Sequence, residues 1–405
     1  MGYTRDAIKG LGWMTFLRGI TRGLAVVKMA ILARILLPSQ FGNYGIALLV
    51  LGFLEVLTET GINIFLIQEK GDIQKYLNSA WVVSIIRGTL ICLVILLTSP
   101  LIVKFFNVAQ AKNLLYLISA VAFVRGFINP MKVAFQKKLQ FMKEFLFQGS
   151  LYLIDAGIAI SLGIITRSES AMIIGMLAAA ITEVFLSFIL FKEKPKLFFE
   201  KDKVLKVINS GKWVTGAGVF SYLFQNIDNI VVGKFLGTSS LGFYQQAYNV
   251  STLPVSEVGQ IFNKVTFPVF VKISGDTQRL KKAFFKTLGV ISGLVIPFSL
   301  IIFLFSRPII LLFLGENWLS IEPVLRILVI FGVLKSILNF SYALFLSLKL
   351  QKYVMYSELM GILGMGLVIY PMTIRFGIVG AGASTLVAFI CSLPVIIYGF
   401  KKIFK

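Results

Sequence analysis

Twelve apolar stretches, each long enough to cross the hydrocarbon core of a bilayer as a helix, dominate this chain. Mean hydropathy is +0.86 and only 14% of the residues are charged, which is more apolar surface than a soluble protein of 405 residues can bury. The sequence therefore predicts an all-α, polytopic membrane protein with twelve transmembrane helices. Pro130, Pro254 and Pro297 mark spans that are expected to bend or break. The spans are expected at 11–36, 42–66, 79–103, 113–134, 143–166, 171–191, 213–236, 241–271, 283–305, 322–348, 353–374 and 379–400.

The chain also repeats itself at an offset of 200 residues. Residues 33–44 align with residues 233–244, and the match extends outward to Trp13 over Trp213. A duplicated hydrophobic chain is typical of a transporter that holds its substrate between two bundles.

The long polar segment 192–212 separates the two copies, with six expected spans on each side. We expect an N-terminal six-helix lobe at 1–191, a cytoplasmic amphipathic linker helix within 192–212, and a C-terminal six-helix lobe at 213–405. An even number of spans per lobe means that both lobes enter the membrane in the same direction, so the two six-helix lobes are parallel. Since each chain contains both lobes, we expect a monomer.

Basic residues follow the loops. The formal net charge of +22 would suggest nucleic acid binding in a soluble protein. Here the termini and even-numbered loops carry twenty-four Lys and Arg residues, against five in the odd-numbered loops. The positive-inside rule then places both termini in the cytoplasm of a multi-pass cell (inner) membrane protein. The excess charge is explained by topology and contact with anionic lipid, and no nucleic acid partner is expected.

Ionisable groups inside spans are costly and point to function. Span 1 carries Arg18, Arg22 and Lys28 on one face roughly 120° wide, and Arg87 and Arg125 extend this cationic set. Guanidinium groups bind phosphate oxygens in pairs, so these five residues are candidates for binding an anionic head such as pyrophosphate. The alternative is that the side chains of Arg18 and Arg22 extend to the cytoplasmic membrane–water interface and have no role in substrate binding.

The remaining polar groups divide into two sets. One is a set of charged groups for gating or ion coupling, or for structural salt bridges: Glu55, Glu59, Asp155, Glu183, Glu257 and Lys264. The other is a set of amides and a carboxylate suited to sugar hydroxyls, or to polar helix packing: Gln225, Asp228, Asn229 and Gln260.

What the chain lacks narrows its function. It has no histidine, which excludes His-based metal sites and catalytic dyads, and it has no phosphate-binding loop for ATP. We expect no enzyme activity, cofactor or metal. The alternatives to a lipid-linked glycan exporter are a cation-coupled multidrug exporter and, on weaker grounds because the outer loops are short, a membrane glycan polymerase or ligase.

Two blocks carry a resemblance to a known family. The first contains Ala33-Arg34, Leu36, Pro38 and Phe41-Gly42, followed by Glu55, Gly61 and Leu66-Ile67-Gln68. The second contains Asp228-Asn229, Val232-Gly233-Lys234-Phe235-Leu236-Gly237, Leu241-Gly242, Tyr244, Ala247-Tyr248, Leu253-Pro254-Val255 and Gly259-Gln260. Together they resemble bacterial polysaccharide-export flippases of the multidrug/oligosaccharidyl-lipid/polysaccharide (MOP) superfamily, most closely the colanic acid and teichuronic acid exporters.

The resemblance implies two lobes that rock between inward-open and outward-open states. It implies a substrate in which an oligosaccharide is linked through pyrophosphate to undecaprenol, with the lipid tail left in the bilayer. Polysaccharide assembly enzymes are further candidate partners. Members of this family often carry two more spans after the twelfth, which this sequence does not show.

Overall fold

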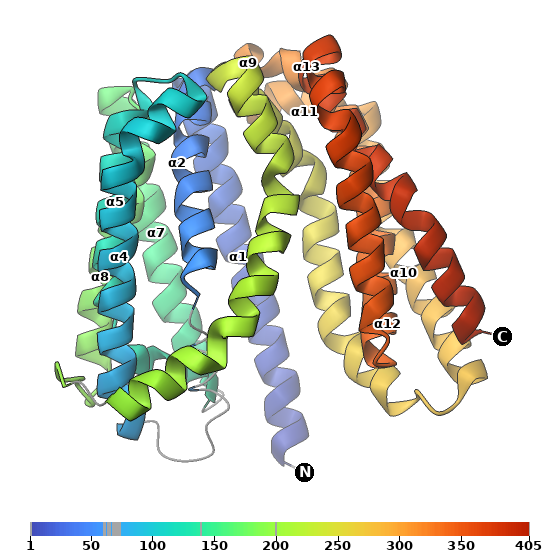
Figure 1. Ribbon diagram of the computed structural model, residues 1–405, viewed down its shortest axis with the longest axis horizontal. Coiled ribbons are helices and arrows are strands. Elements are labelled where there is room, and N and C mark those ends of the chain that lie inside the picture. Colours follow the sequence, from blue (N-terminus) through green and yellow to red (C-terminus); the bar gives the residue numbers. More distant parts are fainter. Residues whose placement is uncertain are drawn as a thin grey trace. The chain divides into compact units, whose positions relative to one another are not determined.

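The computed structural model describes residues 2–59, 62, 66, 74–137, 140–198 and 201–404; within these, the side chains of 2–18, 141, 201–217, 254–265 and 267–268 are not described. All regular elements of the described part are helices (Figure 1). They are α1 (Gly2–Ile35), α2 (Pro38–Leu57), α4 (Gln74–Phe106), α5 (Ala111–Gly126), η1 (Pro130–Val133), α6 (Ala134–Lys137), α7 (Phe141–Thr166), α8 (Ser170–Leu190), α9 (Lys201–Lys272), α10 (Thr277–Leu304), α11 (Ser306–Phe313), η2 (Glu316–Ile321), α12 (Glu322–Ser347) and α13 (Gln351–Ile403).

Many of these helices are long and apolar enough to cross a membrane. Six pass by length and composition among the described residues, and a seventh candidate is the pair Ala111–Arg125 and Pro130–Lys137, bent by 74°. The predicted break at Pro130 is therefore confirmed, whereas α10 continues as a helix through Pro297. Leu97 and Leu367 are 77% and 79% exposed, as expected of side chains that face lipid.

The chain forms two compact units, Met1–Asn226 and Ile227–Lys405. The linker sequence does not form a separate helix, because residues 194–198 are not helical and α9 begins at Lys201 and runs on into the apolar segment. The part of α9 up to Asn226 belongs to the first unit. There the Tyr222 hydroxyl donates to the backbone oxygen of Leu49 at 2.8 Å, in a notch left by Gly52.

The repeated sequence block forms a helix break at the same aligned position in both copies. In the first copy, Leu37 is extended between α1 and α2, and Pro38 starts α2 with its fixed φ. In the second copy, Gly237 has φ 81° and ψ −179°, a conformation that side-chain-bearing residues rarely adopt, and α9 turns there (Figure 1).

The second unit is held together by aromatic packing and a helical hairpin. Phe284 stacks on Phe340 with ring centroids 5.1 Å apart, and both belong to a buried apolar cluster of α9, α10 and α12. Gly377, with φ 60°, bends α13 into two arms. The arms are joined by a hydrogen bond from the Ser392 hydroxyl to the backbone oxygen of Ser357.

Candidate functional site

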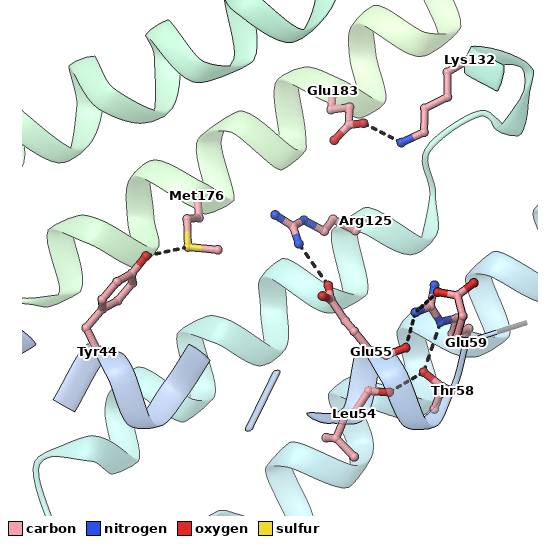
Figure 2. A network of polar contacts seen from close by, with 10 residues as sticks. Tyr44, Leu54, Glu55, Thr58, Glu59, Arg125, Lys132, Met176 and Glu183 are labelled. Atoms are coloured by element: carbon pink, nitrogen blue, oxygen red, sulfur yellow. Dashed lines mark hydrogen bonds and ion pairs between the residues drawn. The ribbon is translucent and has the colours of Figure 1, made fainter. Parts of the chain in front are cut away.

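A cavity of about 270 Å³ lies inside the first unit, among α2, α4, α5, η1 and α8. Its charged lining consists of three cations and three carboxylates. They are the cations Arg87, Arg125 and Lys132 and the carboxylates Glu55, Glu59 and Glu183. The rest of the lining is apolar or small, so the charges are concentrated on a few side chains (Figure 2).

The last turn of α2 and the residues directly after it supply two of the carboxylates, Glu55 and Glu59. Arg125 of α5 donates from Nη1 to Oε1 of Glu55 at 3.1 Å. Arg87 of α4 lies 3.4 Å from Oε2 of Glu59 and also donates to the backbone oxygen of Glu55 at 2.6 Å. Because the last carbonyl groups of a helix lack partners within it, Arg87 both caps α2 and holds the Glu59 carboxylate in the cavity.

The third pair is positioned by the break after α5. Asn129 accepts a hydrogen bond from the backbone nitrogen of Met131 and so caps η1, while its own backbone nitrogen donates to Ser187 of α8. Ser187 lies one helical turn after Glu183. This alignment brings Lys132 Nζ to 2.8 Å from Oε1 of Glu183 (Figure 2).

Two glycines set the spacing of the arginines. A Cβ atom on Gly88 would lie 2.8 Å from the backbone oxygen of Ala122 and 2.9 Å from Cα of Gly126. Helices α4 and α5 therefore cross almost backbone to backbone at this point. Since Arg87 and Arg125 each precede one of the two glycines, the crossing brings both side chains to the same cavity.

The five expected cations are not gathered in one place. Arg87 and Arg125 line the cavity, but Lys28 is not among its lining residues. Lys28 Nζ instead lies 2.7 Å from both carboxylate oxygens of Asp155, and both side chains are largely buried between α1 and α7. Arg22 is half-buried on α1. The side chain of Arg18 lies outside the described residues.

The residues expected to contact sugar have different surroundings. Gln225 is exposed and donates to Ser221 in the first unit. Asp228, in the second unit, is 3% exposed, and its carboxylate accepts from the Tyr244 hydroxyl at 2.8 Å and from Asn229. The hydrogen bond between Asp228 and Tyr244 joins residues on either side of the helix break at Gly237. The side chains of Gln260, Glu257 and Lys264 lie outside the described residues.

Lys132 is the cavity residue that the sequence interpretation missed. It lies within the expected fourth span, two residues after Pro130. Because the helix is interrupted there, helical periodicity does not assign this side chain to a face. The available signal was the proline itself, because a broken span inside a membrane is tolerated where it lines a cavity.

A bundle of apolar helices with paired charges around an internal cavity defines a membrane protein with a polar chamber, the general plan of a transporter. Comparisons with known proteins agree. Residues 31–323 match the family described as polysaccharide biosynthesis protein. The lipopolysaccharide biosynthesis protein WzxC of Escherichia coli (strain K12) is 29% identical over 342 residues, which cover 84% of this chain and 69% of WzxC.

Solved structures show the fold. The lipid II flippase MurJ in an inward closed conformation has a TM-score of 0.79 at 18% identity, covering 96% of this chain and 88% of MurJ. A multidrug resistance MATE family transporter of the MOP superfamily, inward-facing, has a TM-score of 0.73 at 14% identity, with 94% of each chain covered. The chain belongs to the polysaccharide biosynthesis protein family and has the all-helical fold of MOP superfamily transporters.

Proposed function

We propose that this protein is a flippase that moves undecaprenyl-pyrophosphate-linked oligosaccharide from the cytoplasmic to the outer leaflet for cell-surface polysaccharide biosynthesis. The observation that carries this proposal is the charged cavity inside the first unit, in a chain of a polysaccharide biosynthesis family. Ionisable groups within a bilayer cost free energy, so their presence points to a function. Lining a path for the polar headgroup of a lipid is the function that explains them. The names of WzxC and MurJ point to the same kind of substrate.

The architecture in this proposal has twelve spans in two parallel six-helix lobes, 1–191 and 213–405, in the cell (inner) membrane with both termini cytoplasmic. A single chain then suffices for alternating access, so the working unit is a monomer. Arg18 and Arg22 are assigned to the pyrophosphate, and Asp155, whose ion-pair partner is Lys28, to gating or ion coupling. Polysaccharide assembly enzymes are the proposed neighbours in the membrane.

The other functions considered have less support. A cation-coupled drug exporter is expected to have a lumen dominated by carboxylates, whereas this cavity has as many cations as carboxylates. A glycan polymerase or ligase needs catalytic groups on an outer domain, and the described loops are short: α7 and α8, for example, are separated only by residues 167–169.

The proposal is tested in proteoliposomes that contain a fluorescent polyprenyl-pyrophosphate oligosaccharide. A membrane-impermeant quencher reports the fraction of headgroups reached from outside over time. We expect this fraction to rise beyond the outer-leaflet half with the wild-type protein, and the rise to slow at least tenfold in Arg125→Gln and in Arg18→Ala/Arg22→Ala. Arg326→Gln is the matched control, because Arg326 pairs with Glu322 within α12 and is not among the residues that line the cavity. A wild-type protein that moves no lipid under any ion gradient would refute the proposal.

A further inference from the structure

The charges that line the cavity are balanced. Three cations face three carboxylates, and the nitrogen–oxygen distances of the pairs are 3.4 Å for Arg87 with Glu59, 3.1 Å for Arg125 with Glu55 and 2.8 Å for Lys132 with Glu183. A diphosphate that entered would displace carboxylates from their partners. Each displaced carboxylate would then lie next to another anion, which is unfavourable. The cavity is therefore poorly suited to an anion.

The same lining is well suited to hydroxyl groups. The Arg125 and Glu55 side chains are 39% and 37% exposed despite their pairing. A guanidinium has five N–H donors and a carboxylate about four acceptor positions, and the described contacts of this pair use one donor and one acceptor between the two side chains. Each pair thus offers both donors and acceptors to the cavity. A hydroxyl group is both donor and acceptor, so adjacent hydroxyls can satisfy both members of a pair without separating them.

Size and apolar lining narrow the ligand further. A volume of about 270 Å³ is room for a single sugar ring. Ile62, Ile91, Ile128 and Pro130 supply apolar surface for the C–H groups of such a ring.

We infer that this cavity binds one uncharged sugar ring of the transported glycan, through hydrogen bonds to the pairs Arg125–Glu55 and Lys132–Glu183. The inference rests on the proposed flippase function and names the part of the substrate that this site holds. It assigns Arg87 a positioning role, because this side chain is engaged with the end of α2. It places the pyrophosphate outside the cavity.

The test measures occupancy of the cavity directly. Ser84 lines it, so a Ser84→Cys variant is prepared in a Cys92→Ser/Cys391→Ser background and labelled with a small maleimide in proteoliposomes. Two protectants are compared: the lipid-linked oligosaccharide extracted from the strain that encodes the protein, and undecaprenyl pyrophosphate without sugar. Ser168→Cys, half-buried between α7 and α8, is the control position and should be protected by neither lipid.

We expect the glycan-bearing lipid to slow labelling of Ser84→Cys and the bare pyrophosphate lipid to leave it unchanged. Glu183→Gln and Glu55→Gln should each raise the half-protecting concentration about tenfold, because each removes a charged acceptor. Glu169→Gln, which alters a carboxylate at the start of α8 outside the cavity, should have no effect.

Equal protection of Ser84→Cys by the two lipids, or protection by neither lipid, would each overturn the inference. The quenching assay on the same proteoliposomes separates this failure from that of the proposed function. Transport without sugar-dependent protection rejects the sugar site alone. Protection without transport rejects the flippase.

Discussion

Two tyrosines at the same repeat position bond to different partners. Tyr44 donates to the sulfur of Met176 at 3.4 Å, whereas Tyr244 donates to the Asp228 carboxylate at 2.8 Å and is fully buried. A thioether is a weak acceptor and a carboxylate a strong one. The two hydroxyls are therefore expected to differ in their contribution to stability although their backbone positions correspond.

The first prediction compares Tyr244→Phe with Tyr44→Phe. Tyr244→Phe leaves a buried carboxylate oxygen without this donor and should lower the free energy of unfolding by about 2 kcal/mol. Tyr44→Phe should lower it by about 0.5 kcal/mol or less. Thermal unfolding of the two variants in the same detergent measures the difference. Equal losses in the free energy of unfolding would mean that the hydrogen bond from Tyr244 to Asp228 stabilises the protein no more than the contact of Tyr44 with Met176.

The second prediction concerns the Lys28–Asp155 pair, whose side chains are 15% and 19% exposed. Lys28→Met or Asp155→Asn alone leaves a buried group without its partner and should cost about 3 kcal/mol. The double variant should be more stable than either single one, because no unpaired charge remains. A double-mutant cycle followed by unfolding measures this coupling. Additive losses would show that the pair is not coupled in the folded protein.

The crossing of α4 and α5 determines where the two cavity arginines lie. Gly88 and Gly126 allow the backbones to touch, and the next residue in the N-terminal direction on each helix is a cavity arginine. A side chain at the crossing must push the helices apart, since the obstructing atoms are backbone. Wider spacing would move Arg87 and Arg125 away from Glu59 and Glu55.

The third prediction is that Gly88→Ala costs about 2 kcal/mol of stability through overpacking and also reduces transport. Gly157→Ala is the matched control, because Gly157 lies in α7 with open space where its Cβ would be. That control should be neutral, or stabilising by about 0.5 kcal/mol through helix propensity. Unfolding and the quenching assay are measured on both variants, and indistinguishable behaviour would argue against the tight crossing.

Much of the helical layout follows from the sequence, but the partners within the site do not. Apolar length predicted the helical class, and Pro130 predicted a broken span, because both depend on properties local to one segment. The pairing of Lys132 with Glu183 depends on Asn129 contacting Ser187, which lies 58 residues away. Gly88 and Gly126 form no spaced motif within one helix, because α4 and α5 each contribute one glycine to the contact between them. Such facts belong to tertiary packing.

The placement of basic residues along the chain predicts how the protein is oriented in the membrane. The distribution of lysine and arginine predicts that the loop between α7 and α8 is outside and the loop between α9 and α10 is in the cytoplasm. The fourth prediction uses Ser168→Cys and Ser274→Cys in the Cys92→Ser/Cys391→Ser background. A membrane-impermeant maleimide should label Ser168→Cys in intact cells and Ser274→Cys only after the membrane is opened. The reverse pattern would invert the proposed topology.

The shared break at Leu37 and Gly237 has an evolutionary consequence. After a gene duplicates within one reading frame, each copy can change at every position where the two copies have no common structural or functional requirement. Here both copies have kept the break, while the residue that forms it and the partner of the following tyrosine have changed. The position of the break has thus been kept in each half while its backbone conformation and its side-chain contacts have diverged, so that one ancestral unit now supplies two different surroundings along a single chain.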